Sequence, residues 1–314
     1  MTENEFLLQD RLAKIKSTIA KYGEENFYLS FSGGKDSTVL SALLDMACPG
    51  NKIPRVYANT GIDLNMVRDF VFKLAEKDNR IQIIKPTVPI RKMLEEEGYP
   101  FKSMAHSQTV WHWQNRREKT IWIRRYLREE LNENDKKYPP RYACPEILKY
   151  QFTDEFTLKV SDKCCKKLKE DPLKKWQKEN NRPYGLVGLM REEGGRREHA
   201  KCTVFNSNGT LKNFQPLAVI TKEWEDWFIS EYKVEICDIY KPPYSLKRTG
   251  CKGCPFAPDL QKQLDMMEKF FPAERKQCEL IWKPVYDEYR RLGYRLEKNG
   301  EGKQMTIQEI IDDE

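Results

Sequence analysis

The stretch 27–37, FYLSFSGGKDS, decides the fold that the sequence predicts. An apolar strand runs directly into two glycines, and a helical pattern begins at Asp36. Adjacent glycines allow backbone angles that turn successive N–H groups toward one point, and the helix N-terminus adds the positive end of its dipole. Ser32 and Ser37 offer hydroxyl donors and Lys35 a positive charge, while the aspartate can cap the helix or help to hold a cation. We therefore expect a phosphate or sulfate site, although the spacing is neither that of a Walker loop nor G-x-G-x-x-G.

Alternating strand and helix patterns surround this stretch. Helical spacing over 5–22 precedes it, and the segments that follow predict strands at 53–58, 81–84 and 183–190 with a helix over 64–76 between the first two. Such alternation predicts an α/β fold with a parallel twisted sheet and helices on both faces. Helices are also expected over 222–232 and 260–292.

The domain organisation follows from where this alternation stops. A tryptophan- and arginine-rich helical stretch predicts an insertion at about 107–160. We expect a nucleotide-binding α/β domain over 1–215 that contains this insertion. A helical C-terminal region with a C-x-x-C motif is expected over 216–314, packed on the first domain through a cysteine cluster.

Composition restricts the class of protein. The chain has 314 residues, a net charge of +7 and nine cysteines, with 39% hydrophobic and 33% charged residues. These values are typical of a globular protein that favours anionic partners. No apolar run is long enough to span a bilayer and no signal-peptide core is visible, so no membrane partner and a cytoplasmic location are expected. Nine cysteines in that setting indicate thiols or metal ligands rather than disulfides, and a homo-oligomer is compatible with the sequence.

Two cysteine pairs have the spacing of a metal site. Cys164 and Cys165 are adjacent, and Cys251 and Cys254 form a distant C-x-x-C. A C-x-x-C lets two thiolates approach one metal, and a second pair completes four ligands. Four thiolates suit either an iron–sulfur cluster or zinc, which sequence alone does not separate.

An arginine-rich segment follows the strand predicted at 183–190. The sequence GLMREEGGRR over 188–197 brings Arg191, Arg196 and Arg197 close together. Guanidinium groups suit bidentate recognition of phosphate or sulfate. The alternative for Arg191 is a surface ion pair with Glu192.

These motifs resemble a known family. SGGKDS is similar to the PP-loop of ATP pyrophosphatases and phosphoadenosine phosphosulfate (PAPS) reductases, and CC followed by a distant C-x-x-C resembles the [4Fe–4S] ligand pattern of adenylyl-sulfate (APS) reductases. The resemblance implies an enzyme that binds an adenine nucleotide, either ATP, AMP, APS or PAPS, with Mg²⁺ accompanying ATP. It also implies a [4Fe–4S] cluster, with Zn²⁺ as the alternative, held by Cys164, Cys165, Cys251 and Cys254. The implied nucleotide-binding residues are Ser30, Ser32, Gly33, Gly34, Lys35, Asp36, Ser37, Ala58, Asn59, Thr60, Gly61, Gly188, Arg191 and Arg197, of which Lys35, Asp36, Arg191 and Arg197 are the expected catalytic groups.

The sequence also departs from that family. The stretch 188–197 is similar to the G-x-R-x-x-x-S-x-x-R segment of sulfonucleotide reductases, but Met190 replaces its first arginine and Gly194 its serine. Those reductases attack sulfate with a cysteine in a C-terminal E-C-G-L-H-like motif, whereas residues 301–314 contain no cysteine. The last thiol, Cys278, lies in an amphipathic helical pattern and is expected to pack rather than to react.

Three functions therefore compete. The first is attack at the α-phosphorus of ATP with release of pyrophosphate, as in ATP pyrophosphatases and sulfurtransferases, and we favour it. The second is reduction of APS or PAPS through an enzyme thiosulfonate. The third is a nucleic-acid-binding module that keeps the fold, because WHWQNRREKTIWIRRYLR combines aromatic rings with cations. A partly buried helix whose tryptophans pack is the simpler interpretation of that stretch.

Overall fold

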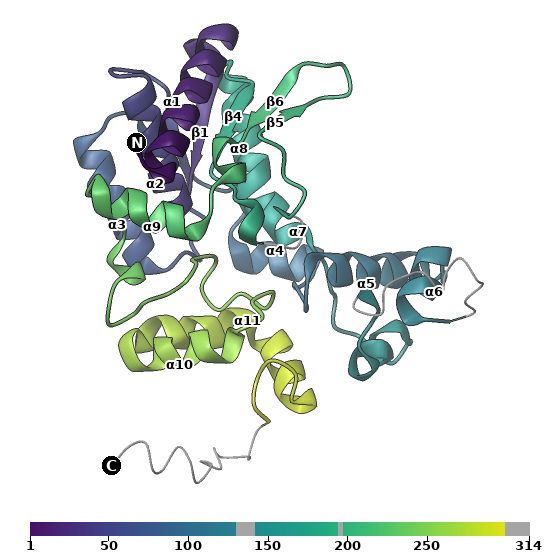
Figure 1. Cartoon of the computed structure of the whole chain (residues 1–314). Coiled ribbons are helices and arrows are strands. Elements are labelled where there is room, and N and C mark those ends of the chain that lie inside the picture. Colours follow the sequence, from purple (N-terminus) through teal and green to yellow (C-terminus); the bar gives the residue numbers. More distant parts are fainter. Residues whose placement is uncertain (130–141, 194–196, 299–314) are drawn as a thin grey trace. The chain divides into compact units, whose positions relative to one another are not determined.

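The computed structural model describes residues 1–129, 142–193 and 197–298 of the chain (Figure 1). The contacts divide it into two compact units, which we call the sheet unit and the helical unit. The sheet unit comprises Met1–Val88 and Lys167–Cys251, and the helical unit comprises Pro89–Lys166 and Lys252–Glu314. Residues 130–141, 194–196 and 299–314 lie outside the described residues, and with them Gly194 and Arg196 of the arginine-rich segment.

The described part of the sheet unit contains one six-stranded sheet in the order β3-β2-β1-β4-β6-β5. All neighbouring pairs are parallel except β5 and β6, which are antiparallel at one edge. The strands are β1 (Phe27–Phe31), β2 (Arg55–Ala58), β3 (Ile81–Ile84), β4 (Tyr184–Val187), β5 (Thr203–Phe205) and β6 (Leu211–Phe214). The predicted parallel α/β fold is confirmed, while the β5–β6 hairpin is an element that the sequence patterns did not indicate.

Helices surround this sheet and also build the second unit. The sheet unit contains α1 (Glu3–Tyr22), α2 (Lys35–Ala47), α3 (Asn65–Lys77), α8 (Asp171–Glu179) and α9 (Lys222–Glu231). The helical unit contains α4 (Ile90–Glu97), α5 (Met104–Arg116), α6 (Ile121–Leu127), α7 (Lys163–Cys165), α10 (Leu260–Phe270) and α11 (Pro272–Leu292). The short 3₁₀ helices used below are η6 (Arg191–Glu193) and η9 (Asp238–Tyr240). The helix predicted over 260–292 is interrupted at Phe271, because a proline at the next position is favourable only in the first turn of a new helix.

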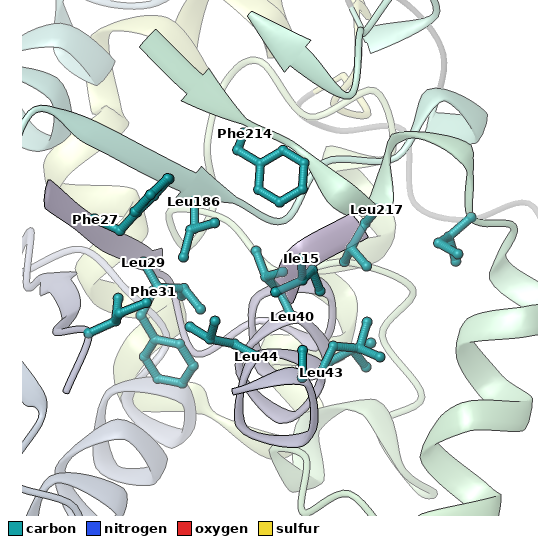
Figure 2. Packing of buried hydrophobic residues seen from close by; sticks show 14 of the residues in the cluster. Ile15, Phe27, Leu29, Phe31, Leu40, Leu43, Leu44, Leu186, Phe214 and Leu217 are labelled. Carbon is teal, nitrogen blue, oxygen red and sulfur yellow. The ribbon is translucent and has the colours of Figure 1, made fainter. Parts of the chain in front are cut away.

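The main core lies on one face of the sheet. Alternate residues of β1 enter this core, and Figure 2 shows Phe27, Leu29 and Phe31 beside the leucines of α2. Tyr28 points to the other face, where its ring lies 5.6 Å from that of Trp176 on α8. Because side chains alternate along a strand, Ser30 also belongs to the α8 face. The strand that precedes the loop is therefore held from both sides.

The units do not follow the boundary predicted at residue 215. After β6, α9 returns to the core of the sheet unit and buries Trp224 and Phe228 beside residues of α1 and α2. The predicted C-terminal region is thus divided at Cys251, because apolar burial and not position along the chain decides membership. The expected insertion is helical, with α5 and α6 inside the range 107–160 or overlapping it. Among the described residues, no helix is both long and apolar enough to cross a membrane.

Candidate nucleotide site

The loop Ser32–Ser37 joins β1 to α2 and is closed by its own hydroxyls. Ser32 Oγ accepts from Gly34 N at 3.2 Å and lies 3.0 Å from Ser37 Oγ, while Ser37 Oγ accepts from Ser32 N at 3.2 Å. Gly34 is the N-cap of α2, so the first N–H groups of that helix face the loop. The loop lies at the carboxyl end of β1, beside the point between β1 and β4 where the strand order reverses. Parallel α/β sheets bind ligands at this place.

Two glycines are required by the local packing. Gly33 has a φ of +69°, and a Cβ there would lie 2.5 Å from Cγ2 of Val71 on α3. A Cβ on Gly188, directly after β4, would lie 2.9 Å from the carbonyl oxygen of Asp36. Gly188 therefore allows the end of β4 to pass close to the first turn of α2, which explains its place in the motif as a packing requirement.

Lys35 is held by two carboxylates of α9. Its Nζ lies 2.8 Å from Oδ1 of Asp226 and 3.2 Å from Oε2 of Glu225. Burial alone lowers the pKa of Lys35, but the hydrogen bond to Asp226 and the charges of both acids outweigh that effect and raise it. The lysine is therefore a cation at neutral pH, positioned at the first residue of α2.

Residues distant in sequence complete the loop environment. The hydroxyl of Tyr240, at the end of η9, accepts from Lys35 N at 3.2 Å and lies 2.6 Å from Oγ1 of Thr249. Burial raises the pKa of Tyr240 to about 12, so this hydroxyl stays protonated. Burial and the nearby charge of Arg248 lower the pKa of Arg197, and Asp36 opposes that effect. These interactions bring Arg197 and Arg248 into the electrostatic surroundings of Asp36.

The predicted arginines take different places. Arg191 lies on η6 and is exposed, and its Nε donates to the carbonyl oxygen of Ala200 at 2.5 Å. That bond fixes the segment that carries Arg197. The structure therefore relates Arg197 electrostatically to the loop, whereas the hydrogen bond of Arg191 supports the backbone at Ala200.

A cavity of about 210 Å³ opens beside the loop and shares Ser32 with it. Ser30 and Ala58, at the ends of β1 and β2, line it together with Phe31, Val56, Tyr57, Asp63, Val67, Lys169, Glu170, Leu173, Thr249 and Gly250. Pockets for drug-sized ligands span roughly 300–1,000 Å³. A cavity of this smaller size suits one end of a nucleotide whose phosphates lie outside it on the loop.

The turn after β2 is built around Asp63. This carboxylate accepts from the hydroxyl of Tyr57 at 3.1 Å and from both N and Oγ1 of Thr60, at 3.1 and 2.9 Å. Asn59 closes the same turn by accepting from Gly61 N at 3.2 Å. Asn59, Thr60 and Gly61 thus belong to the turn that carries Asp63, which lines the cavity, and direct contact of these three residues with a nucleotide stays a prediction.

The cysteine motifs adjoin this cavity in sequence. Asp63 forms an isolated antiparallel bridge with Cys251, and the preceding residues Thr249 and Gly250 line the cavity. Lys169 and Glu170, which also line it, follow Cys165 closely along the chain. Within the sheet unit, the entry to the C-x-x-C is therefore part of the wall of the candidate nucleotide site.

The rest of the C-x-x-C belongs to the helical unit, where α11 holds its backbone. Trp282 Nε1 donates to the carbonyl oxygen of Lys252 at 3.1 Å, and the hydroxyls of Tyr286 and Tyr289 donate to those of Gly253 and Pro255 at 2.5 and 2.8 Å. The three donors share one face of the helix at spacings of four and three residues. These bonds fix the turn around Cys254. Among the described residues, no three histidine, cysteine, aspartate or glutamate side chains gather as a metal-ligand group.

Cys278 also packs in this unit. It is fully buried on α11, and burial raises its pKa to about 12. A thiol with such a pKa is protonated at neutral pH and is a poor nucleophile.

Comparison with known proteins identifies a family whose sequence model matches this chain. The sequence profile of the phosphoadenosine phosphosulfate reductase domain matches residues 26–138 and 118–257, well over half of the chain. No curated protein matches the sequence.

Several solved structures are similar to this chain. A PAPS reductase from Candida auris, in complex with phosphate, is 13% identical with a TM-score of 0.37, covering 74% of this chain and 90% of its own. An NH₃-dependent NAD synthetase from Campylobacter jejuni is 10% identical with a TM-score of 0.42, covering 91% and 96%. A tRNA thiolase from Methanococcus maripaludis, solved with its [4Fe–4S] cluster, is 15% identical with a TM-score of 0.37, covering 96% and 82%.

Proposed function

The chain belongs to the phosphoadenosine phosphosulfate reductase domain family, and we propose that it is an enzyme that binds ATP and directs attack at the α-phosphorus. The observation that carries this proposal is the Ser32–Ser37 loop at the end of β1, which shares Ser32 with a cavity of about 210 Å³. The cavity takes the nucleoside, and the loop with the first turn of α2 takes the phosphates.

The residues of the loop have defined roles in this chemistry. A substrate oxygen attacks the α-phosphorus, the bond to the bridging oxygen breaks, and pyrophosphate leaves with the electron pair onto the loop. Lys35 and Arg197 offset the negative charge that develops on the leaving oxygens. Arg191 positions Arg197 through its bond to Ala200. Asp36 would help to hold Mg²⁺, which neutralises the leaving group when bound, and in a sulfurtransferase sulfur then displaces AMP.

Reduction of APS or PAPS is the alternative within the same family. That reaction requires an accessible thiolate that reaches the sulfur atom. Cys278 follows the C-x-x-C in sequence, but it is fully buried and its pKa is raised to about 12. Its burial favours chemistry at phosphorus. Release of pyrophosphate from ATP, against release of sulfite from APS or PAPS, separates the two reactions.

A four-thiolate centre is the second part of the proposal. We propose that Cys164, Cys165, Cys251 and Cys254 hold a [4Fe–4S] cluster, with Zn²⁺ as the alternative. Support comes from the chemistry of the donor set and from the turn around Cys254, which α11 holds by hydrogen bonds to backbone carbonyls. Such a centre needs reduced thiols, so the proposal includes a cytoplasmic location.

One observation in the helical unit favours nucleic acid as an additional ligand. A cavity of about 500 Å³ lies between α5 and α6, with Arg116 and Trp122 among its lining residues. Trp122 is 63% exposed, so much of its ring surface is open to solvent. Exposed rings beside cations can stack the bases of a single strand.

The expected result for this surface is a selective loss on Trp122→Ala. Stacking on one aromatic side chain contributes about 1–3 kcal/mol per base, so affinity for a single-stranded oligonucleotide should fall about 5–150-fold. Ile121→Ala is the matched control, because Ile121 is 58% exposed on the same helix but has no ring. Fluorescence anisotropy over a salt series measures both variants. Equal affinities for Trp122→Ala and the unaltered protein, or binding that does not depend on salt, would exclude this ligand.

A further inference from the structure

Glu225 on α9 is a buried carboxylate beside the loop. Its side chain is 0% exposed, and among the described residues neither of its oxygens has a partner in a well-formed hydrogen bond. The ammonium of Lys35, 3.2 Å from Oε2, supplies its counter-charge. A buried carboxylate is stable in the charged form only while such a partner stays near it.

The other charges around Glu225 repel its ionised form. Burial raises its pKa, Asp36 from α2 and Asp226 from its own helix add to that effect, and Lys35 opposes it, so that the pKa is about 7. At the start of α9, the carboxylate of Glu192 from η6 accepts from Lys222 N at 2.6 Å. The lysine is thus the group that keeps Glu225 ionised near neutral pH.

The same lysine belongs to the loop that is proposed to bind phosphates. Its ammonium divides three donors between Asp226 and Glu225, and phosphate groups on the loop compete with both acids for those donors. Resting on the proposed nucleotide binding, we infer that phosphates draw Lys35 away from Glu225 and that Glu225 then takes up one proton from solvent. Glu225 is thereby a positioning residue, which holds the lysine in the free protein and releases it as a neutral acid.

The sign of the pH dependence follows from this exchange. Below pH 7 Glu225 is already protonated in the free protein, so binding takes up no proton there. Above pH 7 the bound form holds one proton more than the free form, so affinity falls as the pH rises. Asp226 contacts the same lysine at 2.8 Å but is 67% exposed, so water stabilises its charge when the lysine leaves. Asp226→Asn therefore provides a matched control.

The test is isothermal titration calorimetry with ATP at pH 8, in two buffers that differ in ionisation enthalpy. Phosphate groups have a second pKa of about 6, so ATP itself is fully ionised at this pH. We expect the unaltered protein and Asp226→Asn to take up about one proton when ATP binds, and Glu225→Gln to take up no proton. Glu225→Gln should also bind ATP about tenfold more tightly than the unaltered protein at pH 8 and equally well at pH 6.

The outcomes separate this inference from the proposed function. If Glu225→Gln takes up as many protons as the unaltered protein, the inference is wrong while nucleotide binding stands. If Glu225→Gln does not fold, the unaltered protein still decides, because binding without proton uptake at pH 8 would overturn the inference. If no form binds ATP, the proposed nucleotide site itself is wrong.

Discussion

Gly33→Ala is expected to weaken ATP binding more than tenfold and to lower the free energy of unfolding by roughly 2–5 kcal/mol. The φ of +69° is unfavourable for alanine by about 1–2 kcal/mol. The new Cβ would also lie 2.5 Å from Cγ2 of Val71 and 3.1 Å from Cγ1 of Val67, and such overpacking costs about 1–3 kcal/mol. Relief of the clash requires the loop to move away from α3, which displaces the N–H groups that are proposed to bind phosphate.

Gly209→Ala is the matched control for this substitution. Gly209 has a φ of +78°, but a Cβ there would have nothing within 4 Å. It should therefore lose only the conformational part, about 1–2 kcal/mol, and keep its affinity for ATP. Denaturant titration and ATP titration of both variants make the comparison. Wild-type ATP affinity in Gly33→Ala would show that the loop is not the phosphate site, and equal stability losses would show that the predicted clash with Val71 is absent.

Serine at any one of Cys164, Cys165, Cys251 or Cys254 is expected to abolish the metal centre. A four-thiolate site cannot keep its geometry with one weak oxygen ligand, and the binding free energy of such a metal is largely folding free energy. Metal analysis and absorption spectra of anaerobically purified protein measure the loss, and they also distinguish iron from zinc. The midpoint temperature of thermal unfolding should fall in the variants that lose the metal.

Cys48→Ser and Cys202→Ser are the controls for the cysteine series. Both thiols are partly buried in the sheet unit and pack against its core. They should leave the metal content unchanged. The proposal of a shared centre would be refuted by metal content that is the same in all six variants.

Local patterns made the loop and its flanking elements predictable. β1, the two glycines and α2 are contiguous, and strand periodicity followed by a capped helix encodes them within a few residues. Ser30 and Ala58 line one cavity, because strand ends at one sheet edge are neighbours in any parallel sheet, while their binding of a nucleotide stays a prediction.

The remaining groups of the site could not be predicted from the sequence, because only long-range packing brings them together. Tyr240 lies 205 positions beyond Lys35, and no local pattern connects its hydroxyl with the N–H that it meets. From the sequence, Glu225 and Asp226 are expected to be solvent-exposed acids in the first turns of an amphipathic helix. Only the burial of Trp224 and Phe228 in the sheet core orients α9 so that these carboxylates reach the loop. A charged residue at an otherwise apolar helix face is the signal that could have indicated them.

The interleaved units were unpredictable for a related reason. The chain leaves the sheet unit at Val88, returns at Lys167 and leaves again at Cys251. The exit at Cys251 falls inside the C-x-x-C itself, where spacing indicates ligands but carries no information about packing. The sequence did not predict the short hairpin β5–β6, because strands of three and four residues around a polar turn show too little alternation of apolar and polar residues.

Product analysis tests the central claim most directly. The anaerobic protein is incubated with reductant, Mg²⁺ and, separately, ATP, APS or PAPS, and pyrophosphate and sulfite are assayed for the unaltered protein, Lys35→Met and Cys278→Ser. Attack at the α-phosphorus predicts pyrophosphate from ATP, a loss of at least about 100-fold in Lys35→Met, and little change in Cys278→Ser. Sulfite released from APS or PAPS, and abolished by Cys278→Ser, would contradict the account and assign the protein to sulfonucleotide reduction.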